Sequence, residues 1–161
     1  MDNKGFTLAE MVAVIAILMV LSLLSVPFVR GYIDDSYNGK AQLFLRQLNE
    51  ACLNFEKDYP GTAVSGTMSY DASAGDCNLN SIYGHTNLIV SPEILFKCHY
   101  LQMPTDLKGR YTFKVGTAAE CSSCGKYVRA SLVGEDNAGV YKGKCACING
   151  LGELKKQDVD I

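Results

Sequence analysis

Tryptophan is absent from the 161-residue sequence, and histidine occurs only at His85 and His99. No acidic residue stands at a catalytic spacing from either histidine, so both are expected to be surface or loop residues. The sequence also lacks a Ser-His-Asp arrangement, a phosphate-binding loop and a paired-carboxylate site. We therefore predict that the protein is not an enzyme.

An excess of basic residues is lacking as well. The 15 lysines and arginines are scattered along the chain beside 17 acidic residues, which gives a formal net charge of −2. Proteins that bind nucleic acid usually concentrate basic residues on one face, so no nucleic-acid binding is expected of the isolated chain. Internal repeats, low-complexity tracts and Asn-x-Ser/Thr acceptor sites are absent too.

Charged residues are missing from one long segment, Met11–Val29, which lies between Glu10 and Arg30. About 20 apolar residues are enough to span a bilayer as a helix. A cleaved secretory signal is disfavoured, because Glu10 interrupts the start of the apolar core and the residues after it form a poor small-x-small site. A plain transmembrane anchor fits the length but leaves a costly carboxylate at membrane depth unexplained.

The stretch GFTLAE at residues 5–10, followed by this apolar segment, resembles the N-terminal signature of type IV pilins and of the related pseudopilins of type II secretion. The resemblance implies a leader peptide over residues 1–5. A prepilin peptidase/methyltransferase is then expected to cleave between Gly5 and Phe6 and to methylate the new amine of Phe6.

Glu10 occupies the acidic position of that signature and is expected to act in assembly. In a filament the apolar helices pack together away from water, where an isolated charge is costly and a paired one is tolerable. Glu10 of one subunit is expected to pair with the Phe6 amine of a neighbour and to set the axial register, as buried polar residues do in coiled coils. The plainer alternative places Glu10 at the headgroup level, where an acid near a helix N-terminus is favoured.

Pro27 is the second assembly candidate, because pilins often carry a helix-bending proline at this position. Gly31 and Gly39 are further weak points in a helix. Together they are expected to let the helix bend, or melt locally, when filaments pack. A simple curve without a function is the alternative.

The helical pattern continues beyond the apolar segment and predicts one helix over about 7–58, roughly 75 Å long at 1.5 Å per residue. Its second half has an apolar stripe with three- and four-residue steps. The stripe consists of Ile33, Tyr37, Ala41, Phe44, Leu45, Leu48, Ala51, Cys52, Phe55 and Tyr59. Asp34 and Asp35 are expected on the opposite, polar face, and Pro60-Gly61 is expected to end the helix.

The remaining sequence predicts a small head. Residues 61–80 are rich in small and polar residues and indicate a surface loop. Ser91-Pro92-Glu93 is a helix-start signal, so residues 94–101 are expected to form a short helix. Strands are expected over 110–115, 127–133 and 139–148, with a turn at 134–139.

We therefore predict an α+β protein with the type IV pilin fold, in which the C-terminal half of a long N-terminal helix packs on a small antiparallel sheet. The expected parts are the leader 1–5, the transmembrane or filament-core half of the helix over 6–30, and a globular head over 31–161. The head is expected to comprise an amphipathic helix over 31–59, a loop and short helix over 60–109, and an antiparallel sheet over 110–161.

Seven cysteines are many for this length. Cys52 lies on the apolar stripe and is predicted to be a buried free thiol. The other six are disulfide candidates, because an exported head meets oxidising conditions. They are Cys77, Cys98, Cys121, Cys124, Cys145 and Cys147. Cys77 and Cys98 could join the loop to the short helix, but the connectivity as a whole is not readable from the sequence.

Zinc is the alternative for the last four cysteines, since two close pairs can supply four thiolates. A thioredoxin-type role for Cys121-x-x-Cys124 lacks the surrounding strand–helix pattern. Covalent haem is excluded, because glycine rather than histidine follows Cys124.

Calcium is a further alternative at Glu135, Asp136 and Asn137, which could form an acidic loop. Surface turns are rich in these residue types in any case. We predict no metal site and no cofactor.

The resemblance implies the structural subunit of a type IV pilus or pilus-like filament, a homopolymer built by an assembly platform. The precursor is expected in the bacterial inner membrane, and the product in an extracellular pilus or a periplasmic pseudopilus. Adhesion, motility, DNA uptake and secretion are outcomes of the whole assembly. The first alternative is a type II secretion pseudopilin, although residues 100–115 match that family only in part, with Lys108 where an aromatic residue is usual. A membrane-anchored Cys-rich metal or redox domain is the alternative from another class.

Overall fold

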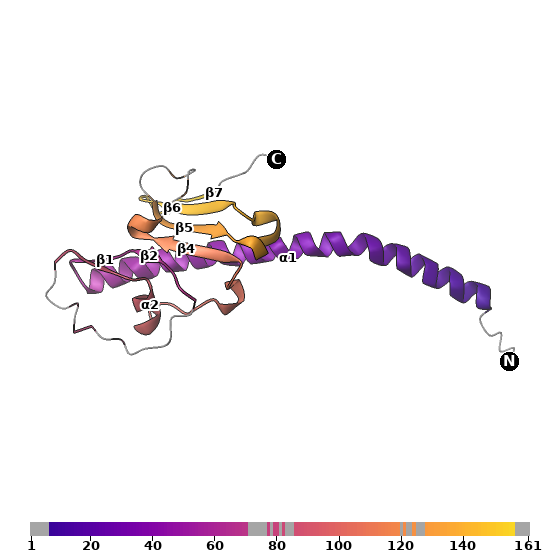
Figure 1. Cartoon of the computed structure of the whole chain (residues 1–161), viewed down its shortest axis with the longest axis horizontal. Coiled ribbons are helices and arrows are strands. Elements are labelled where there is room, and N and C mark those ends of the chain that lie inside the picture. Colours follow the sequence, from indigo (N-terminus) through magenta and orange to yellow (C-terminus); the bar gives the residue numbers. More distant parts are fainter. Residues whose placement is uncertain are drawn as a thin grey trace.

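The computed structural model describes residues 7–70, 77, 79–80, 82, 86–119, 121, 124 and 128–156. One long helix, α1 (Leu8–Asp58), projects from a small head made of short strands and helices. Figure 1 shows that only the second half of α1 lies against the head, while the first half extends alone toward the N-terminus. The predicted α+β, pilin-like architecture is confirmed.

The two ends of α1 lie where the sequence predicted them. Thr7 is the N-cap, and the chain leaves the helix at Tyr59, whose N–H donates to the Phe55 carbonyl at 2.9 Å. Gly61, with a φ of +93°, then turns the chain in a conformation that favours glycine. The helix has 51 residues, which corresponds to about 75 Å.

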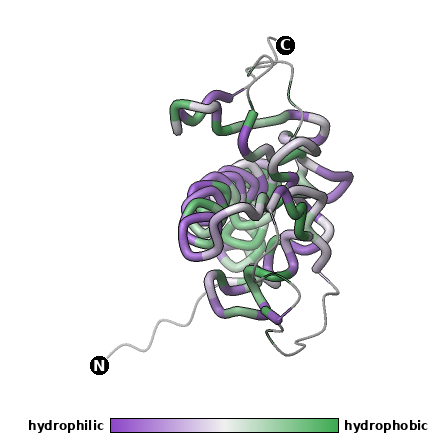
Figure 2. Tube along the Cα trace, turned by 90° about the vertical axis from the view of Figure 1, so that its left-hand side faces the viewer, coloured by the Kyte–Doolittle hydropathy of each residue, from purple (hydrophilic) through white to green (hydrophobic). Residues whose placement is uncertain are grey.

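The core lies between α1 and the sheet. The helix contributes a buried apolar face, which consists of Ala41, Phe44, Leu45, Leu48, Ala51, Cys52 and Phe55. Phe44 packs edge-to-face on Phe113 of the sheet, with ring centroids 4.9 Å apart. Figure 2, which looks along the helix, shows hydrophilic residues of α1 on the side away from the sheet. Ile33 of the predicted stripe is exposed, because the head ends just above it.

The main sheet has five antiparallel strands in the order β2-β4-β5-β6-β7. They are β2 (Gly66–Thr67), β4 (Tyr111–Val115), β5 (Val128–Gly134), β6 (Cys145–Asn149) and β7 (Leu154–Lys156). Phe113, Leu132 and Ala146 lie opposite one another on neighbouring strands, and all three are buried. Because side chains alternate across a strand, this row and its neighbours two residues away form the face that meets α1.

The third predicted strand, 139–148, is wrong in its first half. Residues Asp136–Tyr141 form a 3₁₀ helix, η4, and β6 begins only at Cys145. Gly139 inside η4 has a φ of +63°, which reverses the chain and cannot continue a strand. β4 begins at Tyr111, one residue after its predicted start, and the predicted start of β5 at residue 127 lies outside the described residues. β7 was missed, since it is short and carries two lysines at the sheet edge, where lysine is common.

The predicted surface loop over 61–80 is also wrong in part. Strand β1 (Thr62–Val64) pairs in parallel with β3 (Leu88–Val90), and β2 pairs with β4. Thr62 and Val64 are buried. The composition of this segment indicates a loop, but its strands gain hydrogen bonds from partners far away in the sequence, which local propensity does not report.

The predicted short helix exists but is shorter than expected. Helix α2 spans Glu93–Lys97, and the Glu93 N–H donates to Ser91 Oγ at 3.5 Å. The helix stops before residue 101 because His99 adopts a left-handed φ of +61°. Two 3₁₀ turns, η1 (Thr105–Leu107) and η2 (Gly116–Ala118), complete the connections.

Candidate functional site

The N-terminus of α1 is a capping box. The Glu10 N–H donates to Thr7 Oγ1 at 3.3 Å, and Glu10 Oε2 accepts from the Thr7 N–H and from the Thr7 hydroxyl, each at 2.8 Å. Both bonds to the carboxylate use Oε2, and a carboxylate can accept more. The spacing Thr-x-x-Glu over residues 7–10 is the sequence signal for this cap.

Gly5 and Phe6, the predicted cleavage and methylation residues, lie outside the described residues. Glu10 is four residues from Phe6 in the sequence. Within a single chain its carboxylate therefore holds the first turn of α1 together, whatever it binds in an assembly.

No other part of the described chain packs against the first half of α1. Every residue from Thr7 to Arg30 is exposed, and this is a helix long and apolar enough to cross a membrane. Two polar side chains in the segment are satisfied locally, since Ser22 Oγ donates to the Leu18 carbonyl and Ser25 Oγ to the Ser22 carbonyl. An exposed apolar surface of this length requires a partner, either lipid or other helices.

Pro27 lies inside the continuous helix and does not break it. Its ring removes the N–H that would bond the carbonyl four residues earlier, which is a common cause of bending. Gly31 and Gly39 each have open space where a Cβ would stand. In Figure 1 the bare half curves away from the axis of the head half. The single chain therefore shows a bend, while local melting on filament packing stays a prediction.

The head is attached to α1 at the start of its covered half by a cluster that the sequence did not predict. Asp34 Oδ2 accepts from the Val140 N–H at 3.4 Å, and the Tyr141 hydroxyl donates to Asp35 Oδ1 at 2.6 Å. This hydrogen bond to Asp35 raises the pKa of Tyr141. Asp34 and Asp35, placed by the sequence pattern on the polar outer face, contact η4 instead, because η4 folds around the side of the helix. We call this cluster of Asp34, Asp35, Val140 and Tyr141 the joint.

Arg110, which directly precedes β4, completes the joint. Its guanidinium lies 4.0 Å from the centre of the Tyr37 ring and donates through Nη1 to the Asn137 carbonyl at 3.0 Å. The same Nη1 is 3.8 Å from Asp34 Oδ1. Stacking and a fork of donors are what arginine offers and lysine does not. The joint thereby connects the helix, β4 and η4.

We expect Gly139→Ala to destabilise the head, because a Cβ at this position would overlap the Asp34 carboxylate. A residue with a side chain at such a φ also costs about 1–3 kcal/mol. Thermal unfolding in detergent should show a Tm lower by roughly 5–10 °C. Gly143→Ala is the control, since Gly143 has a φ of +71° but open space around its Cβ. Equal losses in both variants would show that Asp34 does not confine Gly139.

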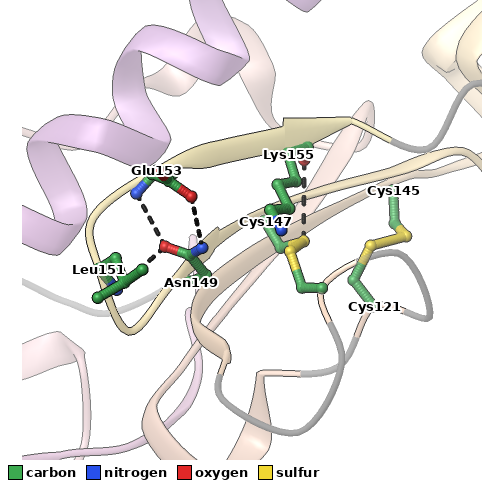
Figure 3. The surroundings of a disulfide bond; sticks show 8 residues. Cys121, Cys145, Cys147, Asn149, Leu151, Glu153 and Lys155 are labelled. Carbon is green, nitrogen blue, oxygen red and sulfur yellow. Dashed lines mark hydrogen bonds between the residues drawn. A yellow bond between two sulfur atoms is a disulfide. The ribbon is translucent and has the colours of Figure 1, made fainter.

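Six cysteines form three disulfides: Cys77–Cys98, Cys121–Cys145 and Cys124–Cys147. Figure 3 shows Cys145 and Cys147 on β6 together with Cys121. Cys145 and Cys147 lie at alternate positions of β6, so both side chains leave the sheet on the face opposite α1. Each bridge is expected to contribute roughly 2–4 kcal/mol. This pairing uses all four sulfurs that the zinc alternative required.

The hairpin after β6 is fixed by Asn149. Its Oδ1 accepts from the N–H groups of Leu151 and Glu153 at 3.0 and 2.9 Å, and its Nδ2 donates to the Glu153 carboxylate at 3.0 Å (Figure 3). Asparagine side chains often bind backbone groups in this way in turns. The hairpin thus presents Leu151 at its exposed tip.

Cys52 is a free, buried thiol. Burial, and secondarily the nearby Glu56, raise the pKa of Cys52 to about 12. At pH 8 this leaves about a thousandfold less thiolate than an unperturbed cysteine carries.

We therefore expect the native chain to resist alkylation at pH 8 and to take up one alkyl group per chain after denaturation without reductant. Mass spectrometry of the intact protein checks both results. Cys52→Ala should take up none. Fast labelling of the native protein would contradict the burial of this thiol, and more than one label after denaturation would contradict the disulfides.

The three residues of the possible calcium loop make contacts within the chain, and neither histidine adds a site in the described part of the chain. The Thr112 hydroxyl donates to the Glu135 carboxylate, and Asp136 pairs with Lys142 at 2.8 Å. Asn137 contributes its carbonyl to the joint. His99 is exposed after α2, and His85 lies outside the described residues.

Comparison with known proteins agrees with the N-terminal features. Residues 1–26 match the family model described as the prokaryotic N-terminal methylation motif. No curated protein and no solved structure shows significant similarity to the chain. The motif is the prepilin signal of type IV pilins and pseudopilins. The motif supports a type IV pilin-like or pseudopilin precursor, and it implies processing by a prepilin peptidase and assembly into pilus-like filaments.

Proposed function

We propose that the chain is the structural subunit of a type IV pilus, which it builds as a homopolymer through its apolar N-terminal helix. The observation that carries the proposal is the bare half of α1, in which every residue from Thr7 to Arg30 is exposed and only Glu10 and Arg30 are charged. Such a surface suits a bilayer before assembly and a bundle of identical helices afterwards. The protein acts mechanically, without catalysis and without a cofactor.

The proposed path begins in the inner membrane, where the peptidase removes residues 1–5 and methylates Phe6. An assembly platform then moves the subunit into the filament. The charged amine of Phe6 leaves water at that step and is paired by Glu10 of a neighbouring subunit. The head, held together by three disulfides, is suited to the oxidising surroundings outside the cell.

A type II secretion pseudopilus is the second candidate, because the N-terminal motif is shared between the two classes. Three disulfides in one small head, and Lys108 in place of the usual aromatic residue, favour the pilus.

Mechanical shearing of intact cells tests this choice. We expect the chain in the sheared fraction as filaments visible by electron microscopy, and unchanged filaments after calcium is chelated. A processed chain that stays with the cell envelope, or filaments that dissociate when calcium is removed, would assign it to a secretion pseudopilus instead.

A further inference from the structure

The end of the head that faces the bare helix is formed by η4. Residues Asp34 and Asp35 bind it through the Val140 N–H and the Tyr141 hydroxyl. In Figure 1 this end of the sheet is the one from which the bare half of α1 emerges. The height of η4 along the helix axis is therefore set by residues 34 and 35.

That height is close to the expected membrane surface. Met11–Val29 comprises 19 residues, or about 28 Å of helix, which matches a hydrocarbon core of about 30 Å. Asp34 lies five residues beyond Val29, which is about 7.5 Å. The headgroup layer adds about 5–8 Å on each side of the core. A helix that places Val29 at the core boundary thus places the joint within or at the outer limit of the headgroup layer.

The side chains at this level suit an interface of mixed polarity. Val140 is 58% exposed although η4 is held firmly, and Tyr32 is 77% exposed on the adjoining helix. Tyrosine is enriched at membrane–water interfaces. The charges nearby are of both signs and partly paired, as in Lys142–Asp136 at 2.8 Å. Contact of such a surface with the bilayer does not require lipid headgroups of one charge sign.

We propose that, in the membrane-inserted subunit before assembly, η4 contacts the phospholipid headgroup layer, so that the head stands on the bilayer at Val140. The inference rests on the proposed function, because it requires α1 to span the membrane. It assigns the joint a role in fixing the head at one height above the bilayer.

The absence of tryptophan makes single-tryptophan reporters possible. Three variants of the full chain are reconstituted in phosphatidylcholine vesicles. Leu21→Trp reports from the middle of the apolar segment, Val140→Trp from η4, and Leu151→Trp from the hairpin tip at the other end of β6. Leu151 is 85% exposed and is separated from the η4 end of the sheet by the five residues of β6, which span about 16 Å at about 3.3 Å each.

Two quenchers are placed at known depths, a nitroxide on the headgroup and bromine near the ends of the acyl chains. We expect bromine to quench Leu21→Trp strongly. The headgroup nitroxide should remove most of the fluorescence of Val140→Trp and little of that of Leu151→Trp. Adding Asp34→Ala and Asp35→Ala to the Val140→Trp chain should release η4 and weaken its quenching, while the fold is checked by disulfide content.

The outcomes separate the two proposals. Equal headgroup quenching at Val140→Trp and Leu151→Trp, with Leu21→Trp quenched by bromine, would overturn the headgroup contact and leave the proposed function standing. Quenching at Val140→Trp that changes with the protein-to-lipid ratio would assign η4 to another copy of the chain and also overturn the contact. An unquenched Leu21→Trp would show that α1 does not insert, which would overturn the proposed function and this inference together.

Discussion

A Glu10→Val variant is expected to insert into the membrane and to lose its leader normally, but to yield at least about 100-fold fewer filaments. Removing one partner of a buried ion pair costs about 3–5 kcal/mol, because the other charge stays buried without compensation. Here that charge is the amine of Phe6. Quantifying the chain in sheared filaments and in membranes by immunoblotting measures the loss.

Two roles of Glu10 have to be separated, since its carboxylate also completes the capping box with Thr7. Glu10→Gln keeps a side-chain oxygen for the cap but removes the charge. Thr7→Val removes the cap, at a cost of about 1 kcal/mol, and keeps the charge. Charge pairing predicts that Glu10→Gln fails to assemble and that processed Thr7→Val assembles. Normal filaments from Glu10→Gln would refute the pairing and leave the cap as the function of Glu10.

A Gly5→Leu variant is expected to keep residues 1–5 and to accumulate in the membrane as the uncut precursor. The resemblance places the cut directly after Gly5, where a leucine side chain would occupy the space next to the bond that the peptidase must approach. An uncut chain has no free amine at Phe6, so neither methylation nor pairing with Glu10 can follow. Intact-mass measurement of the membrane fraction shows whether the leader is present.

Gly31→Leu is the matched control, because it also replaces a glycine by leucine but at a position outside the N-terminal motif. A Cβ at Gly31 meets open space within the chain, so the precursor should fold and be cut. Normal shortening of Gly5→Leu would count against the leader. Failure of both variants to be cut would point to a general defect of insertion.

The long helix could be predicted closely because three local signals agree. The three signals are the uncharged segment Met11–Val29, the apolar stripe of the second half and the Pro60-Gly61 stop, and each can be read from residues that are close together in the sequence. The observed bounds, Leu8–Asp58, follow from them. Signals of this kind need no knowledge of the rest of the fold.

The short strands and the joint could not be predicted in the same way. Strands β1 and β3 are paired although some 26 residues separate Thr62 from Leu88. Asp34 binds a backbone N–H that is 106 residues away. Both depend on tertiary contacts, which override the local preference for a loop or for a solvated helix face.

The state of the cysteines could be predicted from the sequence, but their pairing could not. Their number and the expected export of the head predicted disulfides, and the place of Cys52 on the apolar stripe predicted a buried thiol. Which sulfur meets which depends on the register of β6, where Cys145 lies opposite Val133 and Cys147 opposite Ser131. Register is a property of the folded sheet, so the sequence alone left the connectivity open.

The mass of the N-terminal peptide, measured on material sheared from the cell surface, tests the central claim most directly. A peptide that begins at Phe6 and carries one extra methyl group would establish leader removal, methylation and export in a filament together. A chain that begins at Met1 and occurs only in membranes would contradict the account and leave a membrane-anchored, disulfide-bonded head as the interpretation.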